Sequence, residues 1–297
     1  MESAPQQNRK KALILGAKGM LGQALGQEFR LAGYELGLWD VAEIDLAEET
    51  RSLEKISLFG PDVIINAAAY NAVDSCETDD EEYRKALILN RDVPGYLARF
   101  AAERSVPFVH YSTDYVFDGT APDGYPEDAV PNPISRYGNS KFEGEQAVLA
   151  AGGRAYLIRL SKLFGEPAVS KLGKRSFFEI MLAKGKTETR VEVVDDEKSC
   201  FTYAPDLALA TRELIEALPE PGIYHLPNEG DATWFQSTLE LYRKAELKVE
   251  VIPVTASGFP RPAKRPHASV LLNTKRPKQR PYTEALTEFL DNFLPTV

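Results

Sequence analysis

A glycine-rich turn between an apolar strand and a helix is the feature that most constrains the fold of this chain. The run KALIL at residues 11–15 predicts a buried strand, and the apolar spacing over residues 20–32 predicts a helix. Between them lies GAKGMLG, with glycines at Gly16, Gly19 and Gly22. Such glycines let backbone N–H groups and the positive end of the helix dipole approach a pyrophosphate. The turn therefore predicts a dinucleotide-binding site, with a tight turn that binds nothing as the alternative.

Strands and helices alternate through the first half of the chain. Further strands are predicted at 34–39, 62–66, 106–112 and 155–160, and helices at 48–58, at 79–104 with an interruption near Pro94, and from 134 to about 150. Strands that alternate with helices of about ten or more residues pair in parallel through right-handed crossovers. The predicted fold class is therefore α/β, with a doubly wound parallel sheet of the Rossmann type.

The alternation becomes irregular in the second half, where a smaller α/β substrate-binding lobe is expected. Helices are predicted at 176–185, 204–218, 232–245 and 282–294, and strands at 190–194, 222–226 and 248–254. Some of these segments are expected to return to the main sheet. The predicted dinucleotide-binding domain covers residues 10–160 and includes 186–225, whereas residues 161–185 and 226–297 form the substrate-binding lobe.

The composition argues against several classes of protein. A net charge of −9 disfavours nonspecific binding of nucleic acid, which needs an excess of Lys and Arg. No apolar run approaches the roughly 20 residues of a membrane span, and residues 1–9 are polar, with a loose conformation expected and no signal-peptide pattern. Cys76 and Cys200 form neither a disulfide framework nor a metal-ligand spacing, so no metal site is assigned. A cytoplasmic protein without a nucleic-acid or membrane partner is expected.

An acidic residue ends the second predicted strand. Asp40 stands 24 residues after Gly16, where a carboxylate accepts hydrogen bonds from the adenosine ribose hydroxyls. The same carboxylate would repel a 2′-phosphate, so the sequence favours NADH over NADPH as cofactor. Asp45 and Leu46 are candidates for the adenine end. Solvated loop carboxylates are the alternative interpretation of both acids.

Several spaced motifs together carry a resemblance that one motif could not. The glycines have the spacing G-x-x-G-x-x-G, NAAA follows the third predicted strand, YSTDYVFDG follows the fourth, and Tyr137 and Lys141 lie four residues apart. This set resembles the extended short-chain dehydrogenase/reductase family. Within that family, the chain is similar to the dTDP-4-dehydrorhamnose reductases in NAAAYNAVDSCE, HYSTDYVFDGTAP, YGNSKFEGE, TWFQ and FPRPAKRPHAS, between Gly16 and about Ser269.

The resemblance implies a catalytic set of Thr113, Tyr137 and Lys141. Tyr137 would donate a proton to the carbonyl oxygen, and Thr113 would hydrogen-bond the same oxygen. Lys141 would hold the nicotinamide ribose hydroxyls. The four-residue spacing puts the lysine on the same helix face as the tyrosine, and an ammonium about 4 Å away would lower the pKa of the phenol toward neutrality.

The remaining site residues follow from matching motifs. Cofactor contacts are expected from Gly16, Lys18, Gly19, Met20, Leu21, Gly22, Asp40, Asp45, Leu46, Ala67, Ala68, Ala69, Asn90, Tyr111, Tyr137 and Lys141. Substrate contacts are expected from Thr113, Asp114, Tyr115, Lys162, Arg261 and Arg265. Asn90 would support the lysine, and the arginines, with Lys264, would bind a diphosphate unless they form a solvated basic loop. Trp234 is interpreted as a core anchor rather than as a sugar contact.

The resemblance implies reduction, by NADH or NADPH, of a nucleotide sugar: the C4 ketone of dTDP-4-dehydro-L-rhamnose would become dTDP-L-rhamnose. Two departures leave another nucleotide-linked deoxysugar open, for a reductase or an epimerase. Lys162 stands where these reductases often have tryptophan, and SCFT at 199–202 replaces their G-x-P-T. A third alternative is a non-catalytic regulatory subunit that resembles the β subunit of methionine adenosyltransferase. The resemblance also admits a homodimer and a Mg²⁺ ion, to which no residue is assigned.

Overall fold

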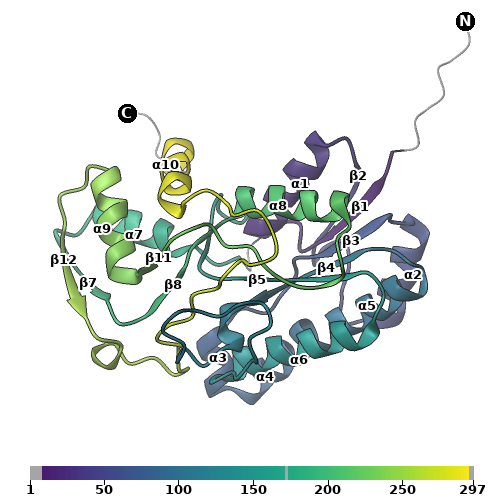
Figure 1. Cartoon of the computed structure of the whole chain (residues 1–297), viewed down its shortest axis with the longest axis horizontal. Helices are drawn as coiled ribbons and strands as arrows, with labels where there is room; N and C mark the ends of the chain where they lie inside the picture. Colours follow the sequence, from purple (N-terminus) through teal and green to yellow (C-terminus); the bar gives the residue numbers. More distant parts are fainter. Residues whose placement is uncertain (1–8, 171–172, 294–297) are drawn as a thin grey trace, which may run out of the picture.

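In the computed structural model, a parallel sheet of six strands forms the centre of the described part of the chain, residues 9–170 and 173–293 (Figure 1). Apart from Arg9, the N-terminal segment expected to be loose lies outside the described residues. The strand order is β10 (Gly222–His225), β5 (Ala155–Leu160), β4 (Phe108–Thr113), β3 (Val63–Asn66), β1 (Lys11–Leu15) and β2 (Glu35–Trp39). All neighbouring strands are parallel. The predicted doubly wound parallel sheet is confirmed.

Helices cover both faces of this sheet, so that its strands are apolar on both sides. On one face lie α1 (Met20–Leu31) and α8 (Ala204–Ala217), and on the other lie α2 (Glu49–Phe59), α5 (Val93–Glu103) and α6 (Arg136–Ala151), as Figure 1 shows. Strand β1 illustrates the alternation. Ala12 and Ile14 pack with α1 and α8, whereas Leu13 and Leu15 pack with the opposite helices.

The segment between β3 and α5 differs in part from the prediction. A short helix, α3 (Val73–Thr78), precedes α4 (Asp80–Leu87), and a π-helical turn, η1 (Ile88–Asp92), joins α4 to α5. Asp79 ends α3 and begins α4, because its carboxylate accepts hydrogen bonds from the N–H groups of Glu81 and Glu82. The expected interruption near Pro94 is therefore the π turn, with the proline in the first turn of α5.

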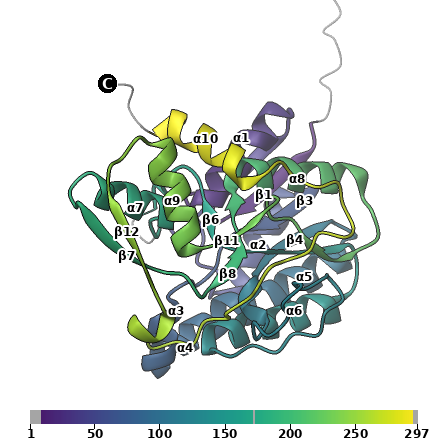
Figure 2. The same ribbon diagram turned by 60° about the vertical axis from the view of Figure 1, so that its left-hand side comes forward.

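The second half builds a smaller lobe beside the carboxyl ends of the strands (Figures 1 and 2). Helices α7 (Phe177–Gly185), α9 (Trp234–Lys244) and α10 (Tyr282–Phe293) pack on three strand pairs. The pairs are β7 (Arg190–Val194) with β12 (Glu250–Val254), β8 (Lys198–Cys200) with β11 (Asp231–Thr233), and β6 (Leu163–Phe164) with β9 (Thr202–Tyr203). The two- and three-residue strands β6, β8, β9 and β11 were not predicted, since so short a run has no measurable periodicity.

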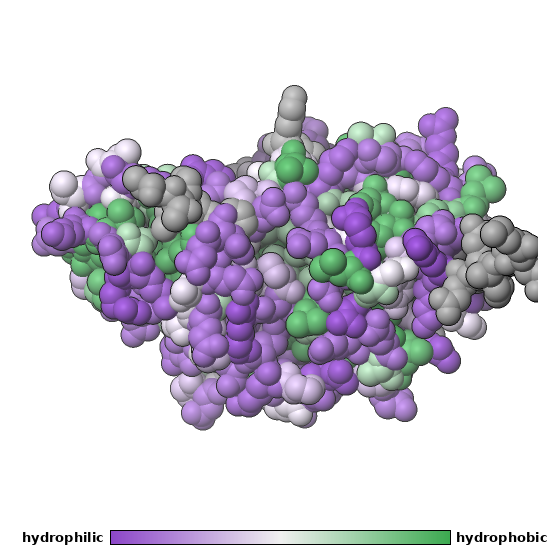
Figure 3. All heavy atoms as spheres, turned by 90° about the horizontal axis from the view of Figure 1, so that it is seen from above, coloured by the Kyte–Doolittle hydropathy of each residue, from purple (hydrophilic) through white to green (hydrophobic). Residues whose placement is uncertain are grey.

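The helices and the visible surface are both consistent with a sequence that has no long apolar run. No helix among the described residues is long and apolar enough to cross a bilayer. On the face seen in Figure 3, hydrophilic residues predominate and apolar ones occur in small groups.

A glycine sets the distance between α6 and η1. A Cβ atom on Gly144 would lie 1.8 Å from the carbonyl oxygen of Asn90, far inside van der Waals contact, and that backbone cannot move without displacing η1. Because α6 carries Tyr137 and Lys141, this close approach also fixes the depth of both side chains against the sheet.

The substitution Gly144→Ala is therefore expected to lower the free energy of unfolding by about 3 kcal/mol, measured by urea denaturation. Gly26→Ala, in α1, is the control. Its Cβ would meet the side chain of Leu38 at 3.3 Å, and the gain in helix propensity of about 1 kcal/mol offsets this contact. Equal losses in the two variants would show that the contact with Asn90 is not the constraint described here.

Candidate active site

A cavity of about 940 Å³ opens at the carboxyl ends of the central strands, where open α/β sheets bind ligands. The glycine turn, α6 and segments of the smaller lobe contribute to its wall. The predicted residues that line it are Gly16, Gly19, Met20, Leu21, Gly22, Asp40, Asp45, Leu46, Ala67, Ala68, Ala69, Tyr111, Thr113, Asp114, Tyr115, Tyr137, Lys141, Lys162 and Arg265. Lys18, Asn90 and Arg261 are not part of the lining.

Two positions in the glycine turn require glycine. Gly16 has φ +77°, and a Cβ there would lie 2.7 Å from the backbone nitrogen of Ala68. A Cβ on Gly22 would lie 2.1 Å from the carbonyl oxygen of Gly16. Gly19 is the N-cap residue of α1 and has no side chain that could cap the first N–H groups of the helix. The turn fits the diphosphate of a dinucleotide.

The acidic residue predicted to face the adenosine ribose closes the other side of this turn. Asp40 accepts hydrogen bonds from the backbone N–H groups of Lys18 at 2.9 Å and Val41 at 2.9 Å. The ammonium of Lys18 pairs with Glu43 at 3.0 Å, and this bond with the others that Glu43 accepts lowers the pKa of its carboxyl. The end of β2 therefore carries Asp40 and Glu43 together with two lysines, Lys18 and Lys55, and Nζ of Lys55 lies 4.7 Å from the ring centroid of Trp39.

Helix α6 brings the tyrosine and the lysine to one wall of the cavity. Ser135 caps the helix by accepting a hydrogen bond from the N–H of Gly138 at 3.1 Å. One turn apart, the side chains of Tyr137 and Lys141 are both buried. The Tyr137 hydroxyl donates to Oδ1 of Asn71 at 3.2 Å, and Nζ of Lys141 donates to the carbonyl oxygen of Tyr111 at 2.6 Å.

The expectation that Lys141 lowers the pKa of Tyr137 is wrong for this structure. Burial raises the pKa of the Tyr137 phenol, Asp114 and Tyr115 raise it further, and a hydrogen bond with Thr113 only partly opposes them. Burial also lowers the pKa of Lys141 to about 8, against the effect of Glu145. Removal from water acts on both groups and disfavours both charged forms, so it outweighs the attraction expected from helix spacing alone.

Polar residues at the end of β4 lie next to the tyrosine. The Thr113 hydroxyl donates to Oδ1 of Asp114 at 3.1 Å, and Ser269 donates to Oδ2 of the same carboxyl at 2.6 Å. Burial raises the pKa of Asp114 to about 6. Tyr115 packs edge to face on Tyr137, with ring centroids 5.8 Å apart. The predicted trio of Thr113, Asp114 and Tyr115 therefore lies together at the cavity wall.

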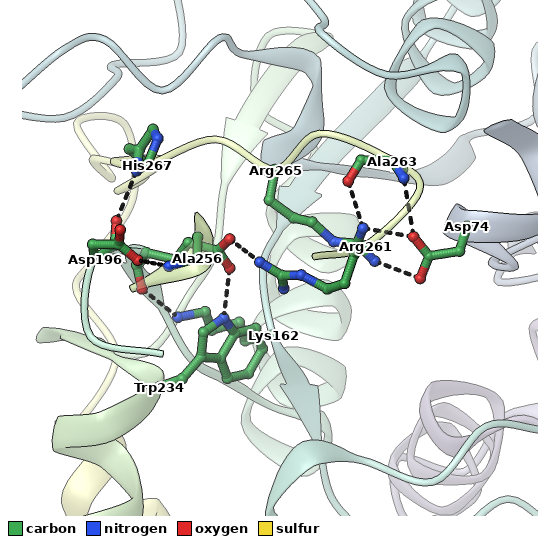
Figure 4. A network of polar contacts seen from close by, with 10 residues as sticks. Asp74, Lys162, Asp196, Trp234, Ala256, Arg261, Ala263, Arg265 and His267 are labelled. Carbon is green, nitrogen blue, oxygen red and sulfur yellow. Dashed lines mark hydrogen bonds and ion pairs between the residues drawn. The ribbon is translucent and has the colours of Figure 1, made fainter. Parts of the chain in front are cut away.

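Lys162 is buried in the smaller lobe, where an indole ring and backbone carbonyl oxygens surround its ammonium (Figure 4). Its backbone has φ +40°, and its Nζ lies 3.9 Å from the ring centroid of Trp234 and donates to the carbonyl oxygen of Ala232 at 3.3 Å. Burial lowers its pKa to about 7. Trp234 also packs on Phe177 with centroids 4.5 Å apart, so it is a core anchor as interpreted, but it lines the cavity as well.

The basic loop is held by two acids (Figure 4). Arg265 lines the cavity and pairs through both terminal nitrogens with Asp74, at 2.6 and 2.7 Å. Arg261 pairs with Glu197, which also accepts a hydrogen bond from Nε1 of Trp234 at 3.1 Å. Lys264 is exposed. The loop is therefore an ordered bridge between the lobes rather than a free basic segment.

Some of the predicted cofactor residues have partners within the protein. Asn90 donates to Oγ of Ser140 at 3.0 Å and exchanges hydrogen bonds with the backbone of Tyr70 at 2.9 and 3.0 Å. It therefore holds the loop after β3, and its hydrogen bonds go to Tyr70 and Ser140 rather than to the lysine. The hydroxyl of Tyr111 lies 2.8 Å from Oγ1 of Thr211, beneath α8.

Sequence reasoning missed several residues at the cavity. They include Asn71, which accepts from Tyr137; Lys174, which donates to the carbonyl oxygen of Asn71 at 2.8 Å; and Glu197. A second acid, Asp74, is outside the lining and pairs with the lining residue Arg265. Asn71 lies in the loop after a strand end, which was a usable signal. The acids gave none, because their arginine partners are 191 and 64 residues away.

Comparison with known proteins adds independent findings. The sequence matches the family described as RmlD substrate binding domain over residues 10–294. It is 33% identical to a dTDP-4-dehydrorhamnose reductase of Aggregatibacter actinomycetemcomitans over 277 residues, 89% of this chain and 91% of the relative. The structure is similar to that of a dTDP-4-dehydrorhamnose reductase from Clostridium acetobutylicum, with a TM-score of 0.89, 34% identity and coverage of 96% and 100%. It is also similar to the Bacillus anthracis reductase in complex with NADP, with a TM-score of 0.89, 29% identity and coverage of 96% and 99%.

The low pKa of Lys162 implies a stability that depends on pH. The unfolded chain keeps this proton up to pH 10.5, whereas the folded chain releases it near pH 7. The folded state thus binds fewer protons between these values, and this lysine opposes folding most at neutral and lower pH. Lys162→Met is expected to raise the free energy of unfolding at pH 7 by about 2 kcal/mol, since the ring of Trp234 already offsets part of the desolvation.

Urea denaturation at several pH values measures this effect, and the gain should disappear as the pH approaches 10.5. The exposed Lys184→Met is the control and should stay within about 0.5 kcal/mol of the parent at every pH. A gain of the same size at all pH values would contradict the titration of Lys162 as its cause.

Proposed function

Because this chain belongs to the RmlD substrate binding domain family, within the extended short-chain dehydrogenases/reductases, we propose that it is an NAD(P)H-dependent reductase of a nucleotide sugar. The membership confirms the resemblance inferred from the spaced motifs. The proposed reaction converts the C4 ketone of dTDP-4-dehydro-L-rhamnose to dTDP-L-rhamnose. The observation that carries the proposal is that Thr113, Tyr137 and Lys141 line the same cavity as the glycine turn.

The chain's own residues supply the proton and the geometry, and the bound nicotinamide supplies the hydride. A phenol whose pKa is raised stays protonated at neutral pH, as a donor to the carbonyl oxygen must. Lys141 uses one of its three N–H donors on the carbonyl oxygen of Tyr111, and its other two can hold ribose hydroxyls. Thr113 directs its hydroxyl at Asp114 and can turn to the substrate oxygen.

Cations at the smaller lobe support a substrate with a diphosphate. Arg265, Lys162 and Lys174 line the cavity on this side, and Arg261 adjoins it through Glu197. A bidentate arginine suits a phosphate as well as a carboxylate, so a diphosphate can replace Asp74 as the partner of Arg265.

We also propose which segments of the second half belong to the cofactor lobe and which belong to the substrate lobe. Helix α8 and strand β10, residues 204–225, pack with the central sheet and belong to the cofactor lobe. Residues 186–203 contain strands that pair with β12, β11 and β6, so they belong with the substrate lobe. Of the segment 186–225, which the sequence assigned to the dinucleotide-binding domain, only residues 204–225 remain there.

Lys162 favours a second candidate function, the reduction or epimerisation of another nucleotide-linked deoxysugar. A buried ammonium beside an indole binds hydroxyl or acidic groups of a sugar, whereas an indole alone stacks on its apolar face. Comparing turnover on a panel of dTDP- and UDP-linked 4-keto sugars separates the two candidates. The intact Thr113, Tyr137 and Lys141 set disfavours a non-catalytic regulatory subunit.

The reductase proposal predicts that removing the hydroxyl of Tyr137 strongly lowers the rate of reduction. Tyr137→Phe should lower kcat for NADH-dependent reduction of dTDP-4-dehydro-L-rhamnose by about 10³-fold, because the proton donor is lost while the ring remains. NADH consumption measures turnover, and fluorescence titration should give an NADH affinity within about twofold of the parent. Tyr83→Phe, in the same aromatic cluster but outside the cavity lining, is the control. A parent protein that consumes no NADH with any sugar of the panel would refute the proposal.

For the cofactor we propose a preference for NADH over NADPH. Asp40 lines the cavity and its carboxylate would repel a 2′-phosphate, while the neighbouring charge of Lys18 is offset by Glu43. Lys55, whose Nζ lies 4.7 Å from the ring centroid of Trp39, is a nearby cation that acts in the opposite direction. Asp40→Ser should therefore raise the ratio of kcat/KM for NADPH to that for NADH by at least about tenfold, or about 1.4 kcal/mol. The exposed Glu48→Gln, outside the lining, should leave the ratio unchanged. An unaltered ratio in Asp40→Ser would remove Asp40 as the discriminating residue.

A further inference from the structure

A buried ion pair lies behind the cavity and takes no part in its lining. Glu145 in α6 and Arg159 in β5 are each 1% exposed. Their contact is bidentate, with Nε to Oε1 at 2.9 Å and Nη2 to Oε2 at 2.6 Å. Replacing such a pair by packed apolar side chains often leaves stability unchanged or raises it, so stability alone does not explain two charges at this depth.

The pair continues the row of functional residues along α6. Tyr137, Lys141 and Glu145 are spaced by four residues each, so they follow one another on one face of the helix, and all three are buried. Glu145 is thus the residue one turn beyond Lys141. Both of its oxygens are held by Arg159, which gives the carboxylate a fixed position one helical turn from Lys141.

Arg159 is itself held from two further sides. Its Nη1 lies 3.4 Å from Nε2 of His225 in β10, whose Nδ1 lies 3.1 Å from the carbonyl oxygen of Leu272. Burial lowers the pKa of His225 to about 3, so this histidine is neutral, with Nδ1–H donating to Leu272 and Nε2 accepting from the arginine. The guanidinium also lies 4.9 Å from the ring centroid of Phe117. These contacts orient the arginine before any ligand binds.

We propose that Glu145 and Arg159 form a positioning pair for Lys141. The pair fixes this turn of α6 on β5 and holds a carboxylate one helical turn from the lysine, so that the buried lysine remains an ammonium. The proposal rests on the proposed function only for the part that Lys141 plays in turnover.

The other charged groups packed around α6 do not replace this carboxylate. His110 in β4 interacts with Lys141 but is neutral, because burial lowers its pKa well below 6.5. The remaining neighbours act elsewhere: Asp114 and Tyr115 from η2 (Asp114–Val116) and Cys76 from α3 act on Tyr137, Arg91 from η1 pairs with Glu143, and Asp80 from α4 pairs with Arg136. Glu145 is the acid that raises the pKa of Lys141 among the described residues, against a burial that lowers it to about 8.

The test titrates Lys141 directly in the ligand-free protein. Its ¹³Cε signal, in protein labelled on lysine and assigned by its loss in Lys141→Arg, is followed against pH. The parent should titrate near pH 8. In the double variant Glu145→Leu/Arg159→Met the midpoint should fall below that of the parent, because the carboxylate that opposes the effect of burial on Lys141 is lost. A midpoint unchanged from the parent overturns the proposal.

A second pair on the same helix gives a matched control. Glu143 and Arg91 face outward, 31% and 38% exposed, at 3.1 Å. The double variant Glu143→Leu/Arg91→Met makes the same chemical change two residues away and should leave the midpoint in place. Equal shifts in both double variants would overturn the proposal. If the inner double variant does not fold, Glu145→Asp withdraws the carboxylate by one methylene and should lower the midpoint in the same direction; no change there overturns the proposal as well.

Turnover gives the second readout. The alkaline limb of the kcat profile should move to lower pH in the inner double variant, whereas a merely structural pair would lower kcat by the same factor at every pH. This readout needs an active parent, and the titration of Lys141 does not. A parent without reductase activity but with the expected fall in midpoint would refute the proposed function and leave the positioning pair intact.

Discussion

The packing of α6 on the parallel sheet is the constraint on which the rest of the site depends. Three contacts set it: Gly144 against the carbonyl oxygen of Asn90, Lys141 against that of Tyr111, and Glu145 against Arg159. One requires the absence of a side chain, one is a short hydrogen bond and one is a buried charge pair. Together they leave Tyr137 facing the cavity floor that the glycine turn and the strand ends form.

Burial is also what gives the site its chemistry. The same exclusion of water raises the pKa of the Tyr137 phenol and lowers the pKa of the Lys141 ammonium. A protonated phenol suits proton donation to a ketone. A lysine that loses its proton near neutral pH, however, would hold ribose hydroxyls less well. We propose that the fixed carboxylate of Glu145, one turn further along the helix, opposes this effect of burial on Lys141.

The smaller lobe is tied to the larger one by the segment between β12 and α10. Arg265 reaches Asp74 of α3, Ser269 reaches Asp114 at the end of β4, and the carbonyl oxygen of Leu272 binds His225 of β10. Each contact joins residues that are distant in the sequence. Residues 265–272 therefore connect the part of the wall for which we propose diphosphate binding to the part that carries the hydroxyls of Thr113 and Tyr137, which we propose to be catalytic.

The sequence by itself determined the central fold and most of the residues predicted to line the cavity, although it missed Asn71, Lys174 and Glu197. Periodicity placed the six strands of the sheet, because each is a run of four to six residues that is largely apolar. The spaced glycines of the first turn indicated a close approach of backbone segments. The motifs also identified the hydroxyl, phenol and ammonium that the fold brings together. Only the tertiary structure decided their electrostatics and their partners. The pKa shifts of Tyr137 and Lys141 follow from burial, which arises only when the chain folds. The ion pair of Arg265 with Asp74 also forms only in the folded chain, because 191 residues separate the two. Local spacing predicts which side chains share a helix face, but the loss of water and the long-range ion pairs that fix their charge are properties of the packed molecule.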